Sequence, residues 1–115
     1  MSEGRQARLA AALRVEISDL VAREVKDPRV HAAGLVTVTR VELSPDLRSA
    51  RAYVSFTGDA AAGAAAVKAL TGAVGFLRGE VARRLSLRRA PDLRFIHDRT
   101  AEHVAKIDAL LKEES

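Results

Sequence analysis

The chain contains no cysteine and no tryptophan, and aromatic residues make up only 3% of it. Without cysteine there is no disulfide framework, no thiolate metal site and no cysteine nucleophile, which is compatible with a reducing compartment. With so few aromatic rings, the interior has to be built from Leu, Val, Ile and Ala side chains, which belong to the 48% of residues that are hydrophobic. The sequence therefore predicts an aliphatic core.

Long apolar segments are also missing. Residues 1–9 are polar and charged rather than an apolar signal core, and no stretch approaches the roughly 20 apolar residues of a membrane span. We therefore expect a cytoplasmic protein with no membrane partner. The 115 residues suit a single domain, 1–115, and are too few for a second independent core.

Patterns typical of enzymes are absent as well. His31, His97 and His103 do not have HExxH spacing, no glycine-rich phosphate loop precedes a predicted helix, and the carboxylates are not clustered for metal ions. His97 and Asp98 end a predicted strand, either as an acid/base pair or as a turn in which Asp98 or Thr100 caps the next helix. The cap explains them better. We expect no catalytic activity, no cofactor and no metal.

Positive charge is in excess. Lys and Arg number 19 against 15 Asp and Glu, which gives a formal net charge of +4 and a sequence pI of about 10.1. Most of the basic residues are arginine, whose planar guanidinium binds phosphate through paired hydrogen bonds and stacks on bases. This balance points to a polyanionic partner, although arginine enrichment also follows from genomic base composition.

The first half of the chain predicts a helix over about 5–26 and then a β-hairpin. Asp27-Pro28 ends the helix, because proline does not fit a helix interior. Segments 35–43 and 48–56 are rich in β-branched residues and flank a turn, which predicts antiparallel strands. The buried face of 35–43 is undecided. The helix stripe is Leu9, Leu13, Ile17, Leu20 and Val21, and the core side of 48–56 is Ala50, Ala52, Val54 and Phe56.

The second half predicts a long helix, a strand over 93–97 and a short final helix. Asp59 is placed to cap the alanine-rich run that starts the long helix, and Pro91 lies beyond its end. The order of elements predicts an α+β fold in which helices pack on one face of a three-stranded sheet. The apolar stripe of the long helix is Val67, Leu70, Val74, Leu77, Val81 and Leu85, and that of the final helix is Val104, Ile107, Leu110 and Leu111.

Two groups of basic residues are candidates for a polyanion site. The first helix carries two pairs 18 residues apart, or five turns, so both pairs project on one side. The end of the long helix carries five arginines, more than are needed to complement its dipole. A solvated helix flank explains the first group equally well. The candidates are Arg5, Arg8, Arg23 and Lys26 in the first group, and Arg78, Arg83, Arg84, Arg88 and Arg89 in the second.

Three glycines, Gly72, Gly75 and Gly79, lie in the long helix on the side opposite its stripe. Each costs about 1 kcal/mol of helix stability relative to alanine, so their presence needs a reason. One reason is the close approach of a polyanion backbone, and the other, which we favour, is a bend in the helix. The segment 72–75 matches the G-x-x-G loop of KH RNA-binding domains, but the apolar period runs through it, which indicates helix rather than loop.

Several motifs agree, in order, with those of one family. The first half has the helix stop Asp27-Pro28-Arg29, the hairpin segments 38–41 and 43–47, and the strand 50–56. The second half has Ala73-Val74-Gly75, the basic helix end 83–87, and a last strand marked by Pro91, Leu93, Phe95 and Asp98. On these motifs the chain resembles the bacterial ribosome-binding factor A family along almost its whole length. It departs in stopping at 112–115, where many relatives extend further, and in having Val104 and Thr100 where relatives often have Gly and Ser.

The resemblance implies a type II KH-like fold of the order helix, strand, strand, helix, bend, helix, strand, helix, with the bend at Ala73, Val74 and Gly75. It also implies binding to the 30S ribosomal subunit and its 16S rRNA, late subunit maturation that includes 5′-end processing, and a part in cold-shock adaptation. Assembly GTPases are implied partners, and a monomer is expected. The alternative is a protein-interaction module that binds an acidic partner through its sheet edge or its sheet face, with Arg51 and Tyr53.

Overall fold

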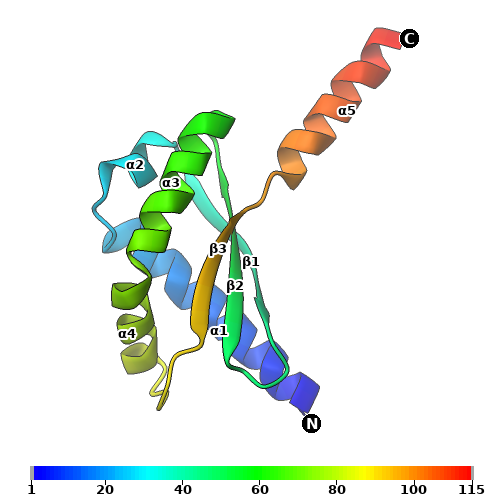
Figure 1. The fold of residues 1–115 in the computed structure, drawn as a ribbon. Helices are drawn as coiled ribbons and strands as arrows, with labels where there is room; N and C mark the ends of the chain where they lie inside the picture. Colours follow the sequence, from blue (N-terminus) through cyan, green and yellow to red (C-terminus); the bar gives the residue numbers. More distant parts are fainter. Residues whose placement is uncertain (1, 115) are drawn as a thin grey trace.

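Helices and strands follow one another in the predicted order in the structure, a computed structural model that describes residues 2–114 (Figure 1). One element was not predicted, the short helix α2. In chain order the elements are α1 (Ser2–Arg23), α2 (Pro28–Ala32), β1 (Val36–Leu43), β2 (Ser49–Phe56), α3 (Ala60–Gly72), α4 (Val74–Arg84), β3 (Asp92–His97) and α5 (Thr100–Glu114).

The helix α2 begins where proline prevents α1 from continuing. The Asp27 carboxylate accepts a hydrogen bond from the backbone N–H of Arg29 (2.9 Å), and Pro28 takes the first helical position, which needs no N–H. α1 ends at Arg23, earlier than predicted, so Lys26 lies in the connection between the two helices rather than on α1. The short helix buries Val30 in the core.

The strands form one sheet in the order β1-β2-β3, and helices cover one of its faces (Figure 1). β1 and β2 are antiparallel neighbours, whereas β2 and β3 are parallel, so the α3–α4 segment crosses over between them. α1, α3 and α4 lie on the same side of the sheet, and its opposite face is open. The predicted α+β arrangement is therefore confirmed for this part of the molecule.

β1 contains a β-bulge that explains its irregular hydrophobic pattern. The register of β1 against β2 shifts between Val38 and Arg40. The extra residue, Thr39, reverses which positions face the helices, so Val38 before the bulge and Leu43 after it are both buried. The buried face of this strand was undecidable from alternation, because alternation changes phase within the strand.

The core is aliphatic, as predicted. α1 and the α3–α4 pair press their apolar stripes against the sheet, and the side chains of β2 that were expected to face inward do so, except that Phe56 is only half-buried. Fully or almost fully buried are Leu13, Ile17, Leu20 and Val21 of α1, Ala50, Ala52 and Val54 of β2, Leu70 of α3, Leu77 and Val81 of α4, and Phe95 of β3.

The long helix is bent at Ala73, where α3 ends and α4 begins. The axes of the two helices differ by 63°, and the Ala73 N–H donates to the carbonyl of Leu70 (3.0 Å). The bend lets the apolar stripe follow the curved surface of the sheet on both sides of the break. In residues 2–114 no single helix meets the length and hydropathy expected of a membrane span, whereas α3 and α4 taken together do.

The final helix α5 forms as predicted, but it projects from the rest of the molecule (Figure 1). Its apolar residues Val104, Ile107, Leu110 and Leu111 are all more than half exposed. The prediction that helices pack on the sheet is therefore wrong for α5. An apolar period predicts a helix with one apolar face, but it does not say whether that face packs against the rest of the same domain.

The pair His97-Asp98 serves packing and capping. A Cβ added to Gly63 of α3 would lie 2.5 Å from the His97 ring, which also packs edge-on against Phe56 at 5.3 Å between centroids. The Asp98 carboxylate accepts hydrogen bonds from the Thr39 hydroxyl (2.7 Å) and the Thr100 backbone N–H (3.0 Å). The cap that the sequence favoured over an acid/base pair is thus confirmed.

Candidate RNA interface

Arg84, one of the predicted RNA-binding residues, joins α4 to α1. Its Nη1 lies 2.8 Å from Asp19 Oδ2 and 3.1 Å from Glu16 Oε2, and only 23% of its side chain is exposed. The hydrogen bond from Arg84 lowers the pKa of Asp19. Two carboxylates neutralise this guanidinium and occupy its hydrogen-bond donors, so it is poorly placed to bind a phosphate. The role of Arg84 is to hold α4 against α1.

Arg78, another predicted site residue, fastens the loop that follows α4. Its Nε donates to the Pro91 carbonyl (3.0 Å) and its Nη2 to the Ala90 carbonyl (3.1 Å), and it pairs with Asp92 at 3.2 Å. These bonds satisfy backbone groups where the chain enters β3. Arg78 therefore fixes the position of the basic loop between α4 and β3.

α4 ends in a left-handed turn that redirects the chain. Ser86 has a φ of 53°, and the N–H of Leu87 donates to the Ala82 carbonyl (2.8 Å), as in a Schellman motif. Glycine normally takes this position, so the sequence showed no obvious helix end here. The turn carries Arg88 and Arg89 off the helix axis and into solvent.

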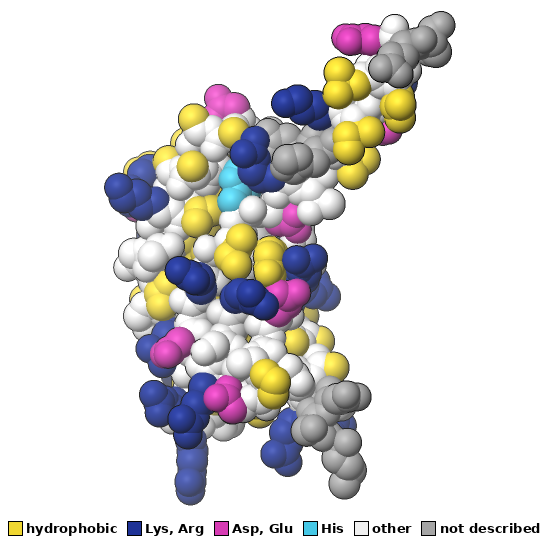
Figure 2. Space-filling model, turned by 45° about the vertical axis from the view of Figure 1, so that its right-hand side comes forward, with side chains coloured by type: hydrophobic (Ala, Val, Ile, Leu, Met, Phe, Trp, Pro, Cys, Tyr) yellow, Lys and Arg dark blue, Asp and Glu magenta, His cyan; other side chains and the backbone are white. Residues whose placement is uncertain are grey.

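Arg83, Arg88 and Arg89 form an exposed group at this end of the molecule, which we name the α4-end cluster. Arg83 pairs with Glu80 one turn earlier but is 70% exposed, and no ion pair to Arg88 or Arg89 is found within residues 2–114. Figure 2 shows Lys and Arg side chains gathered at its lower left. Of the five arginines predicted here, these three remain available to a polyanion.

A groove of about 460 Å³ lies beside the bend, between the α1–α2 connection and the start of α4. We name it the bend groove. Lys26 stands in it without an ion pair among the described residues, and Phe76 is 49% exposed. Arg29 also lines it and is bound through two hydrogen bonds by Asp27, whose pKa that pairing lowers to about 2. Basic, acidic and aromatic groups thus share one concave surface, because Glu24 and Asp27 line it as well.

The three glycines of the long helix are not required by internal packing. A Cβ added at Gly72, Gly75 or Gly79 would meet no atom within 4 Å, and none of the three has a positive φ. The bend that we favoured is present, but it falls at Ala73, between the first two glycines. The helix surface at these glycines has no side chains and no neighbouring atoms. It therefore also fits the other reason considered for the glycines, which is the close approach of a polyanion backbone.

The basic residues of α1 do not form a single ridge. Arg5 and Arg8 are exposed near its N-terminal end, and the 18 residues from Arg5 to Arg23 span about 27 Å of helix. Arg23 is paired with Asp19 at 2.8 Å, whereas Lys26 has left the helix for the bend groove. The structure therefore divides the first candidate group between two ends of the molecule.

Comparison with known proteins supports the resemblance drawn from the motifs. The model of the ribosome-binding factor A family matches residues 5–111. Ribosome-binding factor A of Thermomicrobium roseum is 47% identical over 113 residues, which are 98% of this chain and 85% of that protein. This chain belongs to the ribosome-binding factor A family.

Solved structures of ribosome-binding factor A have the same fold. The crystal structure of the Thermus thermophilus protein matches with a TM-score of 0.72 and 32% identity over 83% of this chain and 97% of that one. A homology model of the Thermus thermophilus protein, fitted into a cryo-electron microscopy map of a 30S complex, matches with a TM-score of 0.58 and 35% identity over 82% of this chain and 91% of that one. The type II KH-like prediction agrees with these relatives.

Several exposed residues that lie in or beside the candidate surfaces were not singled out from the sequence. Phe76 is adjacent to the stripe residue Leu77, and Arg29 belongs to the helix-stop motif, so neither has a sequence signal of its own for the groove that both line. Arg40 and Arg94 were also missed, because they lie on other strands than Arg51, which the sequence already placed on the sheet face. Only the strand register brings these three arginines onto neighbouring positions. In the described part of the chain, no group of three His, Asp or Glu residues is placed to hold a metal ion.

Proposed function

We propose that this protein binds the 30S ribosomal subunit through 16S rRNA and assists late maturation of the subunit without catalysing a covalent step. The observation that carries the proposal is the bare helix surface at Gly72, Gly75 and Gly79 beside the bend groove. Family membership supports it, since a relative was fitted into a map of a 30S complex.

The bend groove suits a folded RNA strand. Without side chains at the glycines, a phosphate can approach the backbone of α4 more closely than it approaches an ordinary helix. Lys26 has no ion pair among the described residues, although Glu24 and Asp27 also line the groove, and the exposed ring of Phe76 offers a stacking surface for an unpaired base. The α4-end cluster adds exposed positive charge at the other end of the same helix.

The binding is noncovalent, so its effect on assembly comes from the RNA conformation it favours. A rigid surface that fits one arrangement of rRNA stabilises that arrangement in proportion to its differential affinity. We propose that this assists the late folding steps on which 5′-end processing depends. Assembly GTPases would then promote release, and the protein would act as a monomer in the cytoplasm.

Sedimentation with purified 30S subunits tests the proposal. The protein should cosediment with subunits, and log K should fall linearly with log salt between about 50 and 200 mM, by about 0.7 to 0.9 per phosphate neutralised. A flat salt response would contradict binding through the RNA backbone. If the protein remains with a partner after complete nuclease digestion, a protein-interaction role explains it better.

A further inference from the structure

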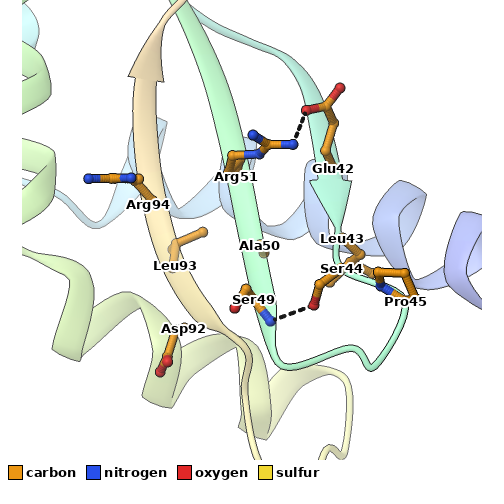
Figure 3. A pocket seen from close by; sticks show the side chains of 10 residues that line it. All are labelled: Glu42, Leu43, Ser44, Pro45, Ser49, Ala50, Arg51, Asp92, Leu93 and Arg94. Carbon is orange, nitrogen blue, oxygen red and sulfur yellow. Dashed lines mark hydrogen bonds and ion pairs between the residues drawn. The ribbon is translucent and has the colours of Figure 1, made fainter.

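The open face of the sheet carries two rows of side chains that run across all of its strands. The registers of both strand pairs align Glu42, Arg51 and Arg94 in one row, and Arg40, Tyr53 and Ile96 in the next. The rows are two residues apart along each strand, a spacing of about 6.6 Å. Figure 3 shows the first row from the open side, with Arg51 turned toward Glu42 and Arg94 turned away from both.

Two arginines occupy neighbouring positions in the first row, with their side chains turned apart (Figure 3). Arg51 and Arg94 are direct neighbours on parallel strands, an arrangement that destabilises a sheet unless an anion compensates it. Glu42 lies 3.1 Å from Arg51 and 3.6 Å from Arg40, so its single charge serves two arginines. Arg94 has no ion pair in the described part of the chain. Three arginines against one glutamate leave the two rows positive.

A stacked guanidinium occupies the second row. The Arg40 Cζ lies 4.0 Å from the centroid of the Tyr53 ring, while the Tyr53 hydroxyl donates to Glu42 Oε1 (2.8 Å). Arg40 lies over the Tyr53 ring and 3.6 Å from Glu42, and 56% of its side chain remains exposed. The guanidinium is therefore held by its neighbours and is still accessible to a partner.

A hollow of about 530 Å³ adjoins the first row at the hairpin end of the sheet. Arg51 and Arg94 border it on one side and the polar residues Ser44 and Ser49 on the other (Figure 3). Asp92, which also lines it, is paired with Arg78 and so adds little negative charge. Glu42 lines the hollow too and is paired with Arg51, so Arg94 is the lining arginine without an ion pair among the described residues.

We propose that the open sheet face is a second RNA-binding surface, which takes a single-stranded segment with a phosphate at Arg51 and Arg94 and a base on the outer face of Arg40. The inference rests on the proposed function in RNA binding but concerns a face opposite the bend groove. Together the two surfaces would let one small domain hold two segments of a folded RNA.

The geometry favours RNA over an acidic protein segment. A carboxylate binds a guanidinium edge-on through its fork of N–H groups, and it has no use for the exposed flat face. A nucleobase covers that face, as bases stack on arginine planes in single-stranded RNA recognition. The Tyr53–Arg40 stack therefore fits a partner that has both rings and phosphates.

Intrinsic fluorescence tests the site directly, because Tyr53 is the only tyrosine and the chain has no tryptophan. A single-stranded RNA dodecamer should change the Tyr53 emission saturably, after correction for RNA absorbance, whereas polyglutamate of equal charge should not. An unchanged signal with RNA would overturn the proposal. An equal response to polyglutamate would replace RNA by an acidic protein as the partner.

Variants separate this proposal from the main function. Arg51→Gln with Arg94→Gln should weaken binding to 30S subunits at least about fivefold and reduce the salt slope by about 1.4, or 0.7 for each of two phosphates. The matched control, Arg14→Gln with Lys106→Gln, removes the same charge from exposed sites elsewhere. If both pairs lose affinity equally, the open face is not a site. If the wild type fails to bind subunits at all, the proposed function itself fails.

A charge-conserving variant tests the stack. Arg40→Lys keeps the positive charge but loses the planar group, so its affinity for the RNA dodecamer should fall about fivefold or more, and Arg40→Gln should fall further. Circular dichroism of each variant checks that the domain is folded. If Arg40→Lys binds as tightly as the wild type, the base is not stacked on Arg40, and the proposed arrangement is wrong.

Discussion

Arg84 on α4 donates a hydrogen bond to Asp19 on α1 across 2.8 Å, joining two helices whose residues are 65 positions apart in the chain. Both helices lie on the same face of the sheet, and this contact adds a polar link to their apolar packing. The role of Arg84 as a helix link has a consequence that can be measured apart from RNA binding.

Arg84→Gln should lower the midpoint of thermal unfolding, because Glu16 and Asp19 would then face each other without their shared cation. Its affinity for 30S subunits, measured where the variant is folded, should stay close to that of the wild type. Arg84→Lys should recover part of the midpoint, since it restores charge without the forked geometry. A variant that is fully stable but binds weakly would contradict the structural role.

The α4-end cluster should behave in the opposite way. Arg88→Gln with Arg89→Gln should leave the unfolding midpoint nearly unchanged, because neither side chain has an ion pair among the described residues. The slope of log K against log salt for subunit binding should fall by about 1.4 to 1.8, which is 0.7 to 0.9 per lost phosphate contact. An unchanged slope would move the primary site away from this end of α4.

Gly79 offers a test in which stability and binding change in opposite directions. Gly79→Ala should stabilise the domain by about 1 kcal/mol, because alanine favours helix and its Cβ meets no neighbouring atom. The added methyl group should weaken subunit binding if RNA approaches the bare helix. Gly63→Ala is the matched control: it should destabilise the domain, since its Cβ would lie 2.5 Å from the His97 ring.

Phe76 and Leu77 are adjacent in sequence but should differ in the effect of truncation. Leu77 is completely buried, so Leu77→Ala should lower the free energy of unfolding by about 2 to 5 kcal/mol, as denaturant titration would measure. Phe76 is 49% exposed, and Phe76→Ala should cost far less stability while it weakens subunit binding. Equal stability losses in the two variants would contradict the exposure of Phe76 in the bend groove.

The stability of the domain should fall as acid protonates two capping carboxylates. Hydrogen bonds from Thr100 and Thr39 lower the pKa of Asp98 to about 2, and those from Arg29 lower the pKa of Asp27 to about 2. A lowered pKa in the folded state means that the stabilisation is complete above about pH 4 and is lost as the pH falls toward 2. Urea titrations across this range should show a flatter pH dependence for Asp27→Asn with Asp98→Asn. An unchanged dependence would contradict these assignments.

Local patterns predicted most of the fold because each depends on near neighbours in the chain. The stripes of α1 and of α3 and α4, the cap at Asp59 and the proline stop at Pro28 all follow from spacing and backbone preference. The β1 bulge was not predictable, since a single extra residue changes the phase of alternation. The helical character of α5 followed from its period, whereas its projection from the domain did not.

The sequence predicted that the candidate site is rich in arginine, but it did not predict which arginines lie together or which are paired. Sequence alone determined that this chain is basic, rich in arginine, built on an aliphatic core and similar in its motifs to one family. Tertiary structure decided which arginines are free. Arg78, Arg84 and Arg51 are bound by groups from other elements, while Arg88, Arg89 and Arg94 have no ion pair among the described residues. The physical reason is that the charge available to a partner depends on neighbours in space, and those lie far away along the chain.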